Sequence, residues 1–158
     1  MKAIRDPVHG YIELGELPLS LLDTKEVQRL RRIRQLGLSH LVYPGANHTR
    51  FEHSLGVMHL AKYMTAHVEE RYRDELVAAA LLHDIGHGPL SHVTEELMVR
   101  HARRRHYDTE DILRSGEVSD VLGDFSLQPS NVSRHIRGDT HVGQILNSEI
   151  DVDRMDYL

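Results

Sequence analysis

The segment LVAAALLHDIGHGPLSH, residues 76–92, joins an unbroken apolar run to a His-Asp pair and a glycine-rich turn. The run carries no charge before His83, so it predicts a central helix that is buried on every side, here expected over Asp74–Asp84. A carboxylate at the end of such a helix needs a partner, because burying it alone is costly. One divalent metal ion could accept His83 and neutralise Asp84 together, so the pair indicates a metal centre.

The composition of the whole chain excludes several function classes. The 158 residues suit one domain with a hydrophobic core, and the 13 His favour metal or acid-base chemistry. The absence of Cys excludes a disulfide framework, a thiolate zinc site and a Cys nucleophile. A formal net charge of -5 argues against broad binding to nucleic acid, although an anionic ligand in a locally basic cleft stays possible. Neither a membrane span nor a signal region is visible, so we expect a cytoplasmic protein without a membrane partner.

Turn residues and apolar spacing predict an all-α fold with a short N-terminal β-hairpin or loop. Asp6-Pro7 begins a turn that Gly10 closes, and residues 11–14 resemble a strand. Asp23 and Glu26 resemble a capping box for a helix that ends at Gly37. The apolar positions of that helix are Val27, Leu30, Ile33 and Leu36.

Further helices are predicted along the rest of the chain. The next is expected from Thr49–Phe51 to about Arg71, with its inner face formed by Leu55, Val57 or Met58, Ala61, Met64 and Val68. Others are expected from Pro89 past Met98, over residues 108–114 and 130–136, and from residue 143 onward. The last residues still follow a helical pattern. We therefore expect one domain, residues 1–158, that is cut short on its C-terminal side.

Four residues form the candidate metal set, namely His53, His83, Asp84 and Asp153. Two imidazoles and two carboxylates suit iron, manganese, zinc or nickel, with water at open positions. Taken alone, His53 would be a helix cap or packed core residue, and Asp153 an ordinary acidic helix residue. The His83-Asp84 pair, followed by a glycine-rich turn and two more His, favours a metal.

Motifs along nearly the whole chain are similar to those of a known family. They are residues 4–10 (IRDPVHG), 28–31 (QRLR), 35–37 (QLG), 43–46 (YPGA), 50–57 (RFEHSLGV), 83–92 (HDIGHGPLSH) and 151–157 (DVDRMDY). This set resembles the HD superfamily of metal-dependent phosphohydrolases. Within it, the set resembles the deoxynucleoside triphosphate triphosphohydrolases, a branch that includes the animal sterile-alpha-motif/HD-domain enzyme and bacterial dGTPases. The resemblance implies an HD-domain helical bundle with the four metal ligands named above.

The resemblance also implies a reaction and its catalytic residues. Similar enzymes cleave a dNTP to deoxynucleoside and triphosphate, through attack of metal-activated water at the α-phosphate. His92 matches the general acid that protonates the leaving oxygen, and Glu95 lies on the same helix face, where the animal enzyme has Asp. His87 is expected to face the phosphates. His106 matches a further active-site His, although it could equally be a loop residue beside the Arg run.

Substrate contacts follow from the same resemblance. Arg50 is the expected triphosphate clamp, because its planar fork suits phosphate oxygens. Arg154 is expected to face the phosphates, Tyr157 to pack on the sugar, and Gln35 with Leu36 to lie near sugar and base. Magnesium is expected to accompany the nucleotide. As isolated residues, these would more often be surface arginines or core side chains.

Some relatives are activated by a guanine nucleotide bound between subunits of a homo-oligomer. The matching residues here are Lys2, Asp23, Gln28 and Arg31, whereas Arg5 replaces an expected Asn. An Asp can accept hydrogen bonds from a guanine edge, and an Arg can hold phosphate. The same residues fit a helix cap and a solvated helix face equally well.

Two other functions stay open from the sequence. The chain could be another HD phosphohydrolase, such as a nucleoside monophosphatase or phosphodiesterase, because metal ligands alone do not separate these activities. It could also be a nucleotide-binding fragment without activity. The motifs around Arg50 and His92 favour the triphosphohydrolase.

Overall fold

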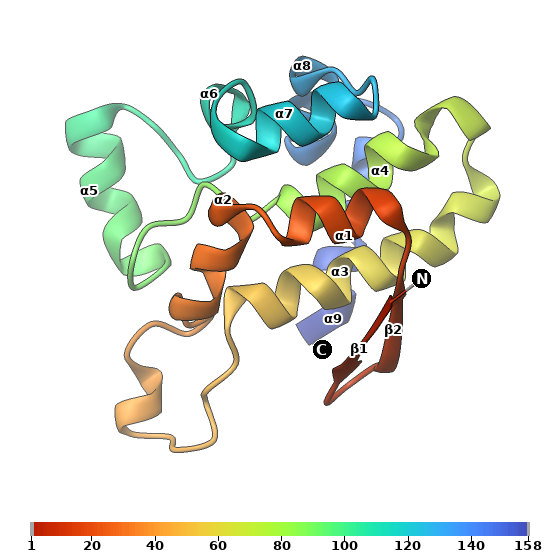
Figure 1. The fold of residues 1–158 in the computed structure, drawn as a ribbon. Helices are drawn as coiled ribbons and strands as arrows, with labels where there is room; N and C mark the ends of the chain where they lie inside the picture. Colours follow the sequence, from red (N-terminus) through yellow and green to blue (C-terminus); the bar gives the residue numbers. More distant parts are fainter. Residues whose placement is uncertain (1, 158) are drawn as a thin grey trace.

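The chain folds into helices around the packed pair α3 and α4, with a small β-hairpin at its N-terminal end (Figure 1). The computed structural model describes residues 2–157, apart from the side chains of His92 and Val93. Strand β1 (Lys2–Asp6) pairs antiparallel with strand β2 (Gly10–Leu14). This architecture confirms the predicted all-α fold with a short hairpin.

Helix α3 (Arg50–Met64) begins at a complete capping box. Thr49 Oγ1 accepts from the Glu52 amide at 3.3 Å, and the Glu52 carboxylate accepts from the Thr49 amide at 2.7 Å. The predicted start is therefore confirmed, whereas the predicted end near Arg71 is wrong. A 3-10 turn, η3 (Thr65–His67), follows α3, and Val68 is extended, so the chain turns back early. On the predicted inner face, Leu55, Val57, Met58 and Ala61 are buried, whereas Met64 is exposed.

Helix α4 (Glu70–Leu82) is the central helix of the fold. Every residue from Leu76 to Leu82 is buried, as the apolar run predicts, and Glu75 is buried as well. The helix was predicted over Asp74–Asp84, but it begins at Glu70 and ends at Leu82. The helix packs on α3, on α1 (Glu16–Leu22) and on α8 (Pro129–Ile136). Because α4 is fixed on these sides, the His83-Asp84 pair at its C-terminal end has a defined position in the core.

The helix predicted from Asp23 to Gly37 is wrong. Its residues form two short pieces, α2 (Lys25–Gln28) and the 3-10 helix η1 (Arg29–Arg32). The Ile33 carbonyl accepts from the Arg50 amide at 2.8 Å, so residues 33–35 pair with residues 48–50 instead of continuing the helix. The predicted capping box fails too, because Asp23 ends α1 and no side chain caps α2.

The remaining helices surround the central pair. They are η2 (Ser39–Leu41), α5 (His92–Ala102), α6 (Glu110–Leu113), α7 (Gly116–Asp124), η4 (Gly143–Ile145) and α9 (Val152–Tyr157). In Figure 1, α6, α7 and α8 gather on one side of α4, α9 lies beside α3, and α5 stands apart at one end. The sequence did not predict α1 or α7. None of the helices in residues 2–157 has the length and apolar character needed to cross a membrane.

Helix α5 begins later than predicted. The expected start was Pro89, but Leu90 and Ser91 have φ values of +63° and +52°, which are incompatible with a right-handed helix. The hydroxyl of Ser91 donates to the Arg34 carbonyl at 2.7 Å in this conformation. The turn after α4 is therefore fixed by a tertiary contact before α5 starts.

Candidate metal centre

Four side chains from separate parts of the chain meet beside α3, and we call them the His-Asp cluster. They are His53 on α3, His83 and Asp84 after α4, and Asp153 on α9. His53 Nε2 lies 2.8 Å from Asp153 Oδ1, which in turn lies 3.8 Å from His83 Nε2. Ligand atoms of His53, His83 and Asp84 lie within 4.8 Å of one another. The structure thus brings together all four residues that the sequence predicts as ligands.

The Nε2 atom of His83 tests whether this cluster suits a metal ion. His83 Nδ1 lies 2.7 Å from the Ala80 carbonyl, which only accepts, so Nδ1 carries a proton and the neutral form of this imidazole has its lone pair on Nε2. This buried Nε2 has no hydrogen-bond partner among the described residues, although Asp84 Oδ1 is only 3.5 Å away. A buried lone pair beside carboxylate oxygens fits a divalent cation, which would bind both donor types.

His53 is held from both sides of its ring by carboxylates. Its Nδ1 lies 2.8 Å from Asp156 Oδ2, opposite the contact of Nε2 with Asp153. Burial alone would lower the pKa of the His53 imidazole. The hydrogen bonds to the two carboxylates outweigh this effect and raise that pKa to about 9. The sequence reasoning missed Asp156. Its signal was its position one helical turn after Asp153, on the same face of α9.

Arg50 binds a residue of the His-Asp cluster directly. Its Nη1 donates to Asp84 Oδ2 at 2.6 Å, and its Nε donates to Ser91 Oγ at 2.8 Å. Both Arg50 and Asp84 are buried. Burial alone would raise the pKa of Asp84, but the nearby His83 and Arg50 hold it well below its usual range. The predicted triphosphate clamp therefore lies at the metal centre, and its role stays a prediction.

A second histidine group adjoins the cluster. The rings of His87 and His106 stack with centroids 4.2 Å apart and planes 14° apart. His106 Nδ1 lies 2.6 Å from Glu95 Oε1, and His87 Nε2 lies 3.4 Å from Asp84 Oδ1. A Cβ at Gly86 would lie 1.8 Å from the His106 carbonyl oxygen, so glycine is required for this approach. The side chain of His92 lies outside the described residues, and its role as general acid stays a prediction.

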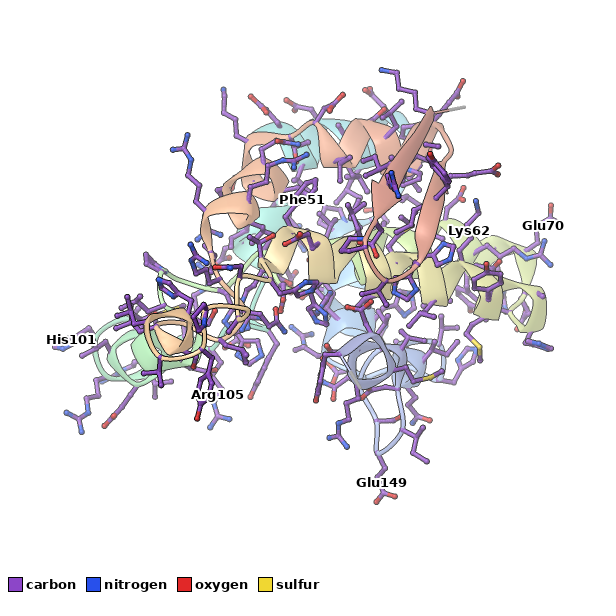
Figure 2. The ribbon with its side chains drawn as sticks, turned by 90° about the horizontal axis from the view of Figure 1, so that it is seen from below. Phe51, Lys62, Glu70, His101, Arg105 and Glu149 are labelled. Atoms are coloured by element: carbon purple, nitrogen blue, oxygen red, sulfur yellow. The ribbon has the colours of Figure 1, made fainter. Side chains whose placement is uncertain are left out.

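These groups open into a cleft of about 770 Å³. Its lining includes Arg50, His83, Asp84, His87, His106 and Asp153, together with the predicted substrate residues Gln35, Leu36 and Tyr157. Its size is within the usual range for a small-molecule site. Arg154 does not line it. That residue is exposed, and its guanidinium donates to the carbonyl of Glu149, which lies at an outward tip of the molecule (Figure 2).

The four predicted effector residues are only partly brought together. Arg31 Nε donates to Gln28 Oε1 at 2.9 Å. Within residues 2–157, no hydrogen bond or ion pair joins this pair to Lys2 or Asp23. Arg31 also stacks over Phe51 and lines a separate cavity of about 290 Å³ beside the hairpin.

Arg29 is a further residue at the site that the sequence did not single out. Its guanidinium donates to the carbonyls of Ile85 and His87 at 3.0 and 2.6 Å. These two bonds hold the turn that follows Asp84. Nothing in the sequence pattern separates Arg29 from its neighbouring arginines, because only the tertiary fold brings η1 beside this turn.

Comparison with known proteins gives consistent findings. The sequence model described as HD domain matches residues 50–158. An uncharacterized Bacillus subtilis protein, YwfO, is 41% identical over 99% of this chain and 39% of its own length. Human deoxynucleoside triphosphate triphosphohydrolase SAMHD1 is 40% identical over 82% of this chain and 24% of its own length.

A solved structure is similar as well. The crystal structure of a hypothetical protein from Aquifex aeolicus superposes with a TM-score of 0.86 and 36% identity. The match covers 99% of this chain and 44% of that protein. The chain therefore spans less than half the length of the relatives that it matches.

Proposed function

Since the chain belongs to the HD domain family, we propose that it is a phosphohydrolase whose His-Asp cluster holds a divalent metal. The observation that carries this proposal is the buried His83 Nε2, which lies beside two carboxylates and has no hydrogen bond to any side chain or backbone group that the structure describes. A cation bound there would act as a Lewis acid and make water a stronger nucleophile near neutral pH. The donors suit iron, manganese, zinc or nickel, and magnesium would accompany the nucleotide.

We propose deoxynucleoside triphosphates as the substrate class. The activity for which the human relative is named supports this choice, as do the size and lining of the cleft. Arg50 and His106 supply cationic or hydrogen-bonding groups for phosphate at the metal end of the cleft. Gln35, Leu36 and Tyr157 supply amide, aliphatic and aromatic surface suited to a sugar and base.

In the proposed reaction, water attacks the α-phosphorus and the bond from that phosphorus to the 5′ oxygen breaks. The products are deoxynucleoside and triphosphate. The departing 5′ oxygen takes up a proton, for which His92 is the proposed general acid. Glu95, three residues further along α5, would orient the imidazoles beside it, as it already does for His106. His87 would face the phosphates.

Product analysis tests this function. The protein is incubated with each dNTP and with manganese, cobalt or magnesium, and the products are separated. Tripolyphosphate plus deoxynucleoside is the expected outcome, and Asp84→Asn should abolish it while the exposed control Asp120→Asn should not. Orthophosphate alone, or hydrolysis of nucleoside monophosphates or phosphodiesters only, would assign a different HD phosphohydrolase activity. Nucleotide binding without any product would identify a binding protein.

Regulation by a guanine nucleotide in a homo-oligomer is a separate proposal. The direct contact between Gln28 and Arg31, and the cavity that Arg31 lines, are what support it. Lys2 and Asp23 would complete the site only if the nucleotide itself bridged them to this pair. Equal rates of dNTP hydrolysis and equal oligomer size with and without GTP would contradict it.

A further inference from the structure

The carboxylate of Asp156 contacts two histidines, His9 in the turn of the N-terminal hairpin and His53 in helix α3. Its Oδ2 lies 2.8 Å from His53 Nδ1, and its Oδ1 lies 2.7 Å from His9 Nε2. The Asp156 side chain is only 4% exposed, so water does not compete strongly for either oxygen. A carboxylate oxygen accepts hydrogen bonds, so the ring nitrogens of His53 and His9 both donate to Asp156.

The hairpin turn holds His9 in place for this contact. The buried carboxylate of Asp6 accepts from the backbone amides of Val8 and His9 at 2.8 and 2.9 Å. These bonds fix the backbone that carries the His9 ring. Figure 2 shows the hairpin lying across α3, with its turn close to α9, in agreement with the contact between His9 and Asp156.

Helix α3 has a glycine at the point where Asp156 contacts His9 and His53. Gly56 lies one turn after His53, and a Cβ there would be 1.7 Å from Asp156 Oδ1 and 2.9 Å from His9 Nε2. Any larger residue would displace the carboxylate from its position between the two rings. The hairpin, α3 and α9 therefore meet at one carboxylate because position 56 has no side chain.

We propose that His9 is a positioning residue of the metal centre, acting on the ligand His53 through Asp156. A carboxylate that accepts from Nδ1 fixes the ring orientation and leaves Nε2 as the metal-binding atom. The donor bond from His9 keeps Asp156 in the orientation that this requires. The inference rests on the proposed metal centre, and it assigns the N-terminal hairpin a role in holding a ligand of α3.

The atom that His9 uses gives a sharp test. The amide nitrogen of Gln can replace Nε2 of a histidine, whereas the shorter side chain of Asn cannot reach as far. His9→Gln should therefore keep the bond to Asp156, and His9→Asn should lose it. A matched control is His135→Asn, which breaks another buried bond from Nε2 to a carboxylate, 2.8 Å to Glu75 Oε2, outside the His-Asp cluster.

The experiment titrates the full chain of each variant with Co²⁺ alone and follows the visible absorption of the bound ion. We expect His9→Asn to weaken Co²⁺ binding by about tenfold and to alter the spectrum, as loss of an outer-shell partner does. The Co²⁺ affinity of His9→Gln should stay within about twofold of that of the unmodified protein, a difference well below the effect of losing an outer-shell partner. The His135→Asn spectrum should be unchanged, even where thermal unfolding shows that this variant is less stable.

Four outcomes would overturn the inference. One is equal binding and an equal spectrum for His9→Asn and the unmodified protein. Another is equal weakening by Gln, Asn and the His135 control, because that would be a general effect of lower stability. If the unmodified protein did not bind Co²⁺, the metal centre itself would be refuted. That result can be told apart from one that contradicts only the role of His9. If His9→Asn does not fold, a Co²⁺ spectrum of His9→Gln that differs from the unmodified protein would also contradict the role.

Discussion

The surroundings of the His83 imidazole indicate a cation site most directly. Its Nδ1 is bonded to the Ala80 carbonyl. Its Nε2 has no hydrogen bond to any described residue and lies 3.5 Å from Asp84 Oδ1 and 3.8 Å from Asp153 Oδ1. We expect His83→Ala to weaken Co²⁺ or Mn²⁺ binding by at least about 100-fold, more than loss of an outer-shell partner. Hydrolysis of dNTPs should fall to background. Titration of metal and separation of products measure the two effects.

A histidine outside the cleft provides the control for that variant. His101 is exposed on α5 and lies at one end of the molecule (Figure 2). His101→Ala should leave metal affinity and hydrolysis unchanged. If His83→Ala retained both properties as well, the cluster would not be the metal centre.

The pKa of His53 predicts how metal binding depends on pH. In the metal-free protein its imidazole is protonated up to a pKa of about 9, because Asp153 and Asp156 outweigh the effect of burial. A metal ion must displace the proton from Nε2, so the affinity for Mn²⁺ should rise by about tenfold from pH 7 to pH 8. Calorimetry in buffers of different ionisation enthalpy should detect release of about one proton per ion. A Mn²⁺ affinity that stays constant or falls from pH 7 to pH 8 would contradict the assignment of His53 as a metal ligand.

The same shift predicts the stability of the metal-free protein. A histidine with a raised pKa stabilises the fold fully below its ordinary pKa of 6.5 and loses that effect as the pH rises through about 9. Denaturant unfolding of chelator-treated protein at pH 6 and pH 9 measures the difference. His53→Gln should remove most of this difference in stability between pH 6 and pH 9.

Individual site residues differ in how far the sequence could predict them. The four members of the His-Asp cluster are carried by motifs, and the fold brings them together. Asp156 and His9 were missed, because their contact depends on how the hairpin and α9 pack against α3. Arg154 was assigned to the phosphates, yet it points to the Glu149 carbonyl, since a motif gives no side-chain direction.

At the scale of elements, prediction succeeded where the local pattern was strong. The uncharged run of α4 left no alternative to burial, and α3 begins at Arg50, within the predicted range Thr49–Phe51. The apolar spacing after Asp23 was misleading. Val27, Leu30 and Ile33 are buried as expected, but Ile33 is extended because its segment pairs with residues 48–50. A contact between distant segments cannot be predicted from helical periodicity alone.

The two capping boxes, one observed and one predicted wrongly, give a stability test. Thr49→Ala removes the acceptor for the Glu52 amide at the start of α3, and should lower the free energy of unfolding by about 1 kcal/mol. Asp23→Ala is the matched control. Asp23 is exposed and caps no helix start, so we expect a change of less than about 0.5 kcal/mol. Denaturant unfolding measures both, and an equal loss for the two variants would contradict the observed capping.

At the scale of the whole molecule, the His-Asp cluster connects segments that are distant in sequence. His53 and Asp153 are 100 positions apart, and α9 is a helix of only six residues. So short a helix has little stability of its own, and its position depends on tertiary contacts. The hydrogen bonds that Asp153 and Asp156 accept from His53 hold α9 against α3. A cation shared by these segments would therefore act as a cross-link of the fold.

Removing the metal should consequently destabilise the protein, and α9 most of all. A ligand that binds only the folded state at about 100 times its Kd contributes about 2.7 kcal/mol. For a chain of this length that corresponds to a rise in Tm of roughly 5–11 °C, which calorimetry with and without a chelator would measure. Amide exchange should slow in α9 on metal binding while that of α7 stays the same, because α7 supplies no residue to the cluster. Asp153→Asn should remove the response of Tm to metal, and a response retained in that variant would place the cation elsewhere.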